Sequence, residues 1–339
     1  MWRATLRCSL RAASSWESRA APPLRRPSRP RNPLAKANSG TPAALRWAHS
    51  ERLPTILEHI HLKGDPSTGL APYEQAEDAQ EEHRARFLQW KASSEGQQRT
   101  SSSQPEMPKP RLISFEATPT FTLGRRQEDL TTEQNTRLQQ PLDIDLLHRR
   151  NPISLRFTPR VKKTNRGGLT TYHGPGQIVL WPVIDMHSAL YPKYGVASYA
   201  NHLETTTQRL LLDLFGIQTY TARDEPGVWA TTSGGQERKI AALGVHHRRY
   251  VTALGIAVNI DVPVTGGEAI NPWARFVPCG LDGRLVTSVA AEVGVDSALG
   301  WDLEDLAGRW ASLFEEGLMD EAKRSVGHGG AQTRLRRRL

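Results

Sequence analysis

Cysteine is scarce in this sequence, and the surroundings of one cysteine suit either a nucleophile or a buried thiol. The chain has two cysteines, Cys8 and Cys279, and the second lies in the segment Val277-Pro278-Cys279-Gly280. Proline fixes φ before the thiol and glycine frees the backbone after it, so the segment can form a sharp loop open on one side. Because free cysteine is commonly buried, these residues alone favour an inert core thiol. A single cysteine in the body of the chain excludes a disulfide framework and a multi-cysteine zinc site.

Residues 166–183 read RGGLTTYHGPGQIVLWPV and bring glycine, tyrosine and histidine together. Glycine is needed where backbone approaches a ligand closely or takes a positive φ. We therefore predict a loop up to Gln177 and a strand after it, with Tyr172 and His173 presented to a substrate. A glycine-rich turn with a structurally hydrogen-bonded histidine is the alternative interpretation.

Three blocks, in order, resemble the lipoyl (octanoyl) transferase family. RGG-x-x-T-Y-H-G-P-G-Q in residues 166–177 is similar to the family signature. KIAALGVHHRRYVTALGIAVNID (239–261) and FVPCG…VTS (276–288) are similar to two further family segments, and weaker similarity covers residues 53–313. The resemblance implies the α+β fold shared by biotin and lipoate protein ligases.

The resemblance also implies a two-step acyl transfer through Cys279, which aligns with the acyl-accepting cysteine of the family. Octanoyl-acyl carrier protein would be the donor, and a lysine on a lipoyl domain of a 2-oxoacid dehydrogenase E2 subunit or on the glycine cleavage H protein would be the acceptor. Lys239 matches the lysine paired with that cysteine; its charge would favour a thiolate, whose pKa is ordinarily about 8.5. It could also exchange protons with the leaving thiol and the incoming amine. Taken alone, Lys239 reads as a solvated lysine at a strand end. No metal and no cofactor beyond the phosphopantetheine of the donor are implied.

Three segments match the substrate-binding residues of the family. They are Arg166, Gly167, Gly168, Leu169, Thr170, Thr171, Tyr172 and His173; Ala242, Leu243 and Gly244; and Gly255, Ile256 and Ala257. Backbone amides there would stabilise an oxyanion, and an apolar slot would bind the acyl chain at about 0.8 kcal/mol per methylene. The chain departs from the family at Trp181, where tyrosine is common, and at Leu169-Thr170, where Gln-Val is commoner. We assign His173 to structure or substrate positioning, with a general base as the alternative.

Other functions and sites remain open at this stage. An ATP-dependent lipoate or biotin protein ligase would share the implied fold, but the sequence has no GxxxxGK[ST] loop and no GRGRxG-type segment. A non-catalytic lipoyl-domain-binding protein is a third interpretation. His246-His247-Arg248-Arg249 predicts a solvated hairpin turn rather than a metal or phosphate site, and it could help an acidic carrier protein to dock.

Periodicity predicts the elements that must position these residues. We expect helices over 73–91, 198–215 and 301–314, the first with Ala76, Ala79, Phe87 and Leu88 facing inward. We expect strands over 53–62, 111–123, 153–157, 178–184, 217–220, 228–231, 239–245 and 251–260. Residues 127–151 predict a loop with a short helix over 144–148. Runs of strands with a few helices indicate an α+β fold with a mixed or antiparallel sheet.

The ends of the chain differ in composition from its body. Ten of the 44 basic residues but only one of the 35 acidic residues lie within residues 1–50, so this segment carries the whole formal charge of +9. The balanced body gives no indication of nucleic-acid binding. Rich in Arg, Ser, Ala and Pro, residues 1–47 predict a presequence for the mitochondrial matrix, with a disordered basic tail as the alternative. We expect a catalytic domain over 48–318 with a low-complexity insertion at 92–110, and a disordered basic tail at 319–339. No apolar run approaches the roughly 18 residues that indicate a membrane span.

Overall fold

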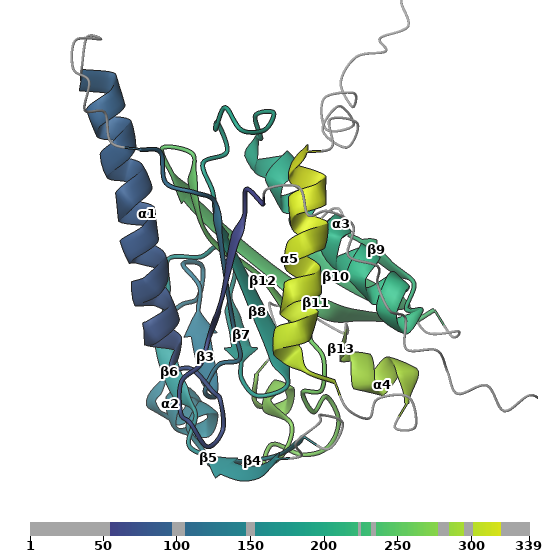
Figure 1. Cartoon of the computed structure of the whole chain (residues 1–339). Coiled ribbons are helices and arrows are strands. Elements are labelled where there is room, and N and C mark those ends of the chain that lie inside the picture. The colour runs from purple at the N-terminus through teal and green to yellow at the C-terminus, as the bar shows by residue number, and fades with distance from the viewer. Residues whose placement is uncertain are drawn as a thin grey trace, which may run out of the picture. The chain divides into compact units, whose positions relative to one another are not determined.

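A mixed sheet carries most of the residues that the sequence motifs single out (Figure 1). The computed structural model describes residues 55–96, 106–146, 153–222, 225–231, 235–276, 285–294 and 301–319, which lie in one unit, Arg52–Leu339. Within them, the main sheet has the strand order β1-β2-β8-β12-β11-β10-β9, and β13 lies beside β11. These strands are β1 (Glu58–Leu62), β2 (Arg111–Phe115), β8 (Gln177–Val183), β9 (Thr219–Thr221), β10 (Gly227–Thr231), β11 (Glu237–Arg248), β12 (Val251–Asn259) and β13 (Leu285–Val286). The pairs β1–β2 and β11–β13 are parallel and the other neighbours are antiparallel.

Helices cover both faces of this sheet, and β8 shows why. Ile178 and Leu180 pack into a core with α3 (Val196–Phe215) and α5 (Leu303–Met319). Val179, Trp181 and Val183 alternate with them and pack on the other face, with α1 (Tyr73–Gly96). A strand buried on both sides reads as a continuous apolar run. Figure 1 shows α1 on one side of the sheet and α3 with α5 on the other.

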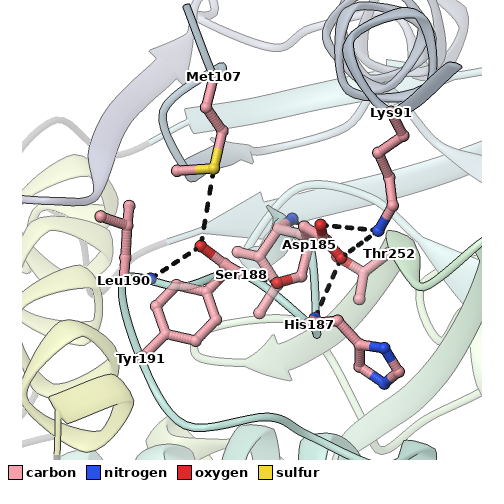
Figure 2. Close-up of polar contacts among 9 residues, drawn as sticks. Lys91, Met107, Asp185, His187, Ser188, Leu190, Tyr191 and Thr252 are labelled. Carbon is pink, nitrogen blue, oxygen red and sulfur yellow. Dashed lines mark hydrogen bonds and ion pairs between the residues drawn. The ribbon is translucent and has the colours of Figure 1, made fainter. Parts of the chain in front are cut away.

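A partly buried ion pair joins the last turns of α1 to the segment after β8 (Figure 2). The Lys91 ammonium donates to both carboxylate oxygens of Asp185 at 2.7 Å, and the backbone N–H of His187 donates to Oδ1 at 3.0 Å. The Tyr191 hydroxyl donates to the Asp185 carbonyl oxygen at 2.8 Å. Because an unpaired buried charge is strongly destabilising, these contacts fix α1 over its face of the sheet.

A smaller sheet and a hairpin lie at one end of the main sheet (Figure 1). The small sheet has the order β6-β3-β7, and the hairpin pairs β4 with β5. Phe121, Tyr172 and Trp273 form the centre of their shared core. The elements are β3 (Thr120–Leu123), β4 (Leu142–Leu146), β5 (Ile153–Phe157), β6 (Arg160–Lys163), β7 (Thr170–His173), α2 (Thr132–Leu138) and the 3-10 helix η1 (Pro272–Arg275); α4 (Val289–Val293) follows β13.

The predicted fold class and the three long helices are confirmed. Ala76 and Phe87 of α1 are buried, with Ala79 and Leu88 packed beside them, and α3 ends at Gly216 with a φ of 66°. Helix α1 continues to Gly96, so the predicted insertion at 92–110 begins as helix; its residues 97–105 lie outside the described residues. The presequence, Cys8 and residues 320–339 also lie outside them, whereas residue 319 ends α5.

Three local predictions were wrong. Thr170–His173 is a strand, β7, rather than a loop, because it pairs with β3 and buries Tyr172. Residues 144–146 belong to β4, and the short helix of this region is α2, which begins after a capping box formed by Thr131 and Gln134. Residues 111–123 form two strands in two different sheets, β2 and β3, and Pro119 lies in the break between them.

Candidate active site

A narrow cavity of about 40 Å³ opens on the α1 face of the main sheet. Its walls come from α1, β7, β8, β11, β12 and the segment before β7. Nine of the fourteen predicted substrate residues line it: Arg166, Thr171, His173, Ala242, Leu243, Gly244, Gly255, Ile256 and Ala257. Segments that are far apart in the sequence therefore meet at one place.

Strand register brings the second and third segments together. Ala242 pairs with Ala257, and Gly244 pairs with Gly255 across β11 and β12. Small side chains on both strands leave the floor of the cavity open. A Cβ at Gly244 would lie 3.2 Å from Cδ of Arg166, so a larger residue there would press on the arginine.

The remaining predicted residues of the first segment do not line the cavity. Gly167, Gly168 and Leu169 form the turn before β7, and Gly168 has a φ of 84°. Tyr172 points to the opposite side, into the small core, with its ring 5.2 Å from that of Phe121. The Thr170 hydroxyl donates to the side-chain oxygen of Gln127 at 2.8 Å.

Arg166 supplies a positive charge to the cavity wall. Its side chain is buried, and the guanidinium donates to the carbonyl oxygen of Thr122 at 2.6 Å and to the Thr122 hydroxyl at 3.0 Å. Nη1 donates to the carbonyl oxygen of Gly167 at 3.0 Å. These bonds hold the planar guanidinium in one orientation at the cavity.

His173 is neutral at physiological pH. Burial lowers its pKa from 6.5 to about 4, an effect that Gln177 opposes and Arg166 reinforces. The Gln177 amide N–H₂ donates to Asn259 Oδ1 at 2.9 Å and to the carbonyl oxygen of Tyr172 at 3.2 Å, so its Oε1 faces Nδ1 of His173 at 2.8 Å. Since an amide oxygen only accepts, Nδ1 carries the proton and Nε2 is the accepting nitrogen of the ring.

Three residues that line the cavity with apolar side chains were not among the predicted substrate residues: Tyr73, Trp181 and Leu254. Trp181 was noted only as a departure from the family. The Tyr73 ring stacks on His173 at 5.4 Å and meets the Trp181 indole edge-on at 5.3 Å. Helical periodicity places Tyr73 at the inward start of α1, but no motif marks it as part of a site.

Lys239 lies on β11, three residues before Ala242, and does not line the cavity. A β-bulge leaves Ile240 without a partner in β10, so Lys239 pairs with Trp229 and shares its face of the sheet. The ammonium lies 4.7 Å from the centre of the Trp229 ring and 3.6 Å from a carboxylate oxygen of Glu225. Lys239 is buried, so it is not the solvated lysine of the alternative interpretation, and its role as a site lysine stays a prediction.

Cys279 lies outside the described residues, which end at Phe276 and resume at Leu285. Both flanks are anchored. The Phe276 ring meets that of Phe121 at 5.5 Å, and Val286 pairs with Lys239. Asn259 Nδ2 donates to the carbonyl oxygen of Thr287 at 2.9 Å, which joins this flank to the hydrogen-bond network of His173. The described residues on the two sides of this gap therefore lie beside Phe121 and beside Lys239.

The predicted hairpin turn lies one step further along the chain than the histidine and arginine cluster, since His246, His247 and Arg248 end β11 and only Arg249 belongs to the turn. His247 and Arg248 at the end of β11 are exposed, as are Arg249 and Tyr250, which form the turn before β12 and have φ values of 50° and 68°. Among the described residues, no group of three His, Cys, Asp or Glu side chains is arranged to hold a metal ion. In the same parts of the chain, no helix has the length and apolarity to cross a membrane.

Comparisons with known proteins agree with the sequence motifs. An octanoyltransferase of Acidobacterium capsulatum is 38% identical over 193 residues, which cover 56% of this chain and 70% of that protein. A probable octanoyltransferase of Schizosaccharomyces pombe is 31% identical over 240 residues, covering 68% of this chain and 86% of that protein. A putative lipoate protein ligase of T. acidophilum, solved with bound lipoic acid, is 12% identical over 80% of this chain and 92% of that chain, with a TM-score of 0.45. Residues 96–301 match the lipoyl protein ligase A/B catalytic domain, and the chain belongs to that family.

Proposed function

We propose that this protein is an acyltransferase that moves an octanoyl or lipoyl group from acyl carrier protein to a lysine of a lipoyl domain. The relatives named octanoyltransferase support the reaction class. The observation that carries the proposal is the meeting of nine predicted substrate residues around one cavity. Its apolar walls suit an alkyl chain, whose burial contributes about 0.8 kcal/mol per methylene.

In the first step, the sulfur of Cys279 forms a bond to the acyl carbonyl carbon while the bond to the carrier sulfur breaks, and a proton passes to the leaving thiolate. In the second step, the amine nitrogen of the acceptor lysine bonds to that carbon, the bond to Cys279 breaks, and the amine gives up a proton to the sulfur. Lys239 is the group that exchanges these protons. The pairing of Val286 with Lys239 supports this assignment, because it places the described residues that follow the Cys279 segment beside Lys239 in the sheet.

Arg166 and His173 orient the acyl thioester in this scheme. The fixed guanidinium of Arg166 and the neutral ring of His173 are rigid polar groups beside an apolar cavity. Rigid polar groups of this kind set the orientation of a ligand whose affinity comes from apolar burial. No cofactor or metal takes part, and phosphopantetheine arrives on the carrier.

We assign the activity to the mitochondrial matrix, with lipoyl domains of 2-oxoacid dehydrogenase E2 subunits and the glycine cleavage H protein as acceptors. The assignment of location is supported by the acid-poor, arginine-rich composition of residues 1–47. Deleting residues 1–47 is expected to abolish import into isolated mitochondria; import of the shortened chain at the rate of the full chain would contradict the assignment.

Transfer to a lipoyl domain separates this function from its rivals. Full-length protein incubated with octanoyl-acyl carrier protein and an apo lipoyl domain, without ATP, is expected to produce octanoyl-lipoyl domain. A strict requirement for ATP with free octanoate would identify a ligase instead. A chain that binds the lipoyl domain but modifies it under neither condition would be a non-catalytic binding protein.

A further inference from the structure

Leu254 takes a backbone conformation that leucine rarely adopts. Its φ is 61°, inside the continuous strand β12. The left-handed region is unfavourable for residues with a Cβ and is uncommon in a regular strand. Such strain persists only where surrounding contacts determine the conformation. Contacts around Leu254 therefore impose this strain, and the strain fixes the position of its side chain.

The cause is the neighbouring strand. Pairing of Ile256 with Leu180 and of Val251 with Asp185 places Leu254 opposite Pro182. Proline has no N–H to donate across the pair. The carbonyl oxygen of Pro182 accepts from the Thr252 hydroxyl at 2.8 Å. The backbone N–H of Leu254 instead donates to the side-chain oxygen of Gln80, on α1, at 2.5 Å.

The effect is that the side chain changes face. Ile256 and Val258, two and four residues further along the strand, pack with α3 and α5. Regular alternation would place Leu254 on that same side. It packs instead with α1, Trp181 and Ala257 on the face that holds the cavity.

Leu254 there lines two cavities whose walls differ in charge. It lines the 40 Å³ cavity described above and also a second cavity of about 140 Å³. The second has more titratable side chains in its walls, with Glu77, Glu81, Arg84 and His246 among them. Leu254 is the residue that lines both and also packs into the apolar cluster under α1.

We propose that Leu254 closes the far end of the acyl slot and thereby limits the length of the acyl chain that the enzyme accepts. This inference rests on the proposed acyltransferase function. From Ala242, at the Lys239 end, to Val245, which pairs with Leu254, β11 spans about 10 Å at roughly 3.3 Å per residue. An extended eight-carbon chain, with bonds of about 1.5 Å, is about 9 Å long. Further methylenes would have to displace Leu254 and enter the second cavity, whose charged walls offer less apolar burial.

The first test replaces Leu254 by glycine, which tolerates the positive φ and therefore keeps the strand conformation. Octanoyl and dodecanoyl carrier-protein thioesters are compared as donors for the full-length wild type and for Leu254→Gly. The ratio of kcat/KM for dodecanoyl over octanoyl is expected to rise at least tenfold in the variant. An unchanged ratio would overturn the proposal. Leu190→Gly, in an exposed turn, is the matched control and is expected to keep the wild-type ratio.

A second pair of variants tests the role of Gln80 as a positioning residue. Gln80→Glu retains an oxygen that can accept from Leu254 N–H and is expected to keep the preference for eight carbons. Gln80→Leu removes the acceptor and is expected to raise the dodecanoyl ratio in the same direction as Leu254→Gly. Equal ratios in the two Gln80 variants would show that this hydrogen bond does not position the wall.

Direct binding separates failure of this inference from failure of the proposed function. Octanoate and dodecanoate are titrated calorimetrically into Cys279→Ser and into the Cys279→Ser/Leu254→Gly double variant, where no transfer is required. A relative gain in dodecanoate affinity of at least tenfold in the double variant supports the inference even if the wild type transfers no acyl group. Equal affinity ratios in the two proteins would refute it even if transfer is observed.

Discussion

Replacing His173 by asparagine is expected to remove about 2 kcal/mol of pH-dependent stability between pH 7.5 and pH 5. The pKa of His173 is about 4 in the folded protein, below its ordinary value of 6.5, because the ring is buried. A depressed pKa means that the unfolded chain takes up the proton first as the pH falls. The stabilisation is therefore present above pH 6.5 and is lost progressively as the pH falls towards 4.

The magnitude follows from the position of pH 5 within this window. At pH 5, which is about 1.5 units below the ordinary pKa of 6.5, the histidine is almost fully protonated in the unfolded chain. In the folded protein His173 is still mostly neutral at this pH. At about 1.4 kcal/mol per unit, the loss is about 2 kcal/mol. Asparagine does not titrate, and its amide N–H₂ can still donate to Gln177, so His173→Asn removes the proton linkage without removing the donor.

Urea denaturation of both proteins at pH 7.5, 6.5, 5.5 and 5 measures the effect. Four other histidines with lowered pKa values, His59, His61, His83 and His246, are present in both proteins and cancel in the comparison. The wild type is expected to lose about 2 kcal/mol more than the variant over this range. Parallel pH profiles of the two proteins would refute the assignment of a neutral, buried His173.

Three further perturbations have expected outcomes. Gly255→Ala is expected to destabilise the fold by more than about 2 kcal/mol in thermal or urea denaturation. The added Cβ would lie 2.1 Å from the carbonyl oxygen of Leu180, so a variant as stable as the wild type would contradict the strand geometry. Lys91→Met leaves the buried carboxylate of Asp185 without its cation and is expected to cost about 3–5 kcal/mol, so a loss below about 1 kcal/mol would show that the pair does not hold α1 in place. Lys239→Met keeps an apolar contact with the indole of Trp229, so the far-UV circular dichroism is expected to stay unchanged. The rate of octanoyl transfer is expected to fall at least a hundredfold, and a retained rate would exclude the lysine from proton exchange.

Periodicity was sufficient for the long helices and the apolar strands, because these elements bury one face or both. Helix α3 illustrates this, since periodicity predicted a helix over 198–215 and the helix spans Val196–Phe215. The family motifs predicted a site from three separate segments, and the pairing of β11 with β12 is what brings two of them together. Periodicity was therefore enough for most of the fold, and the family resemblance supplied the residues at the floor of the cavity.

Other features depend on tertiary contacts that spacing does not encode. Strand β7 was missed because the glycines on both sides of it suggested a loop, whereas pairing with β3 and burial of Tyr172 override that local preference. Helix α2 could have been found from the capping-box pattern at Thr131 and Gln134. The bulge that turns Lys239 towards Trp229 and the reversal of Leu254 opposite Pro182 arise from the neighbouring strands, and alternation along one strand predicts the opposite face.

The mass of the intact protein after incubation with octanoyl-acyl carrier protein tests the proposed chemistry most directly. The account predicts that the wild type gains the mass of one octanoyl group, that hydroxylamine removes it, and that Cys279→Ser gains nothing. It predicts in addition that an apo lipoyl domain discharges the adduct and takes up the same mass. An unmodified wild-type protein that still octanoylates the lipoyl domain, or an adduct that persists in Cys279→Ser, would contradict transfer through this thiol.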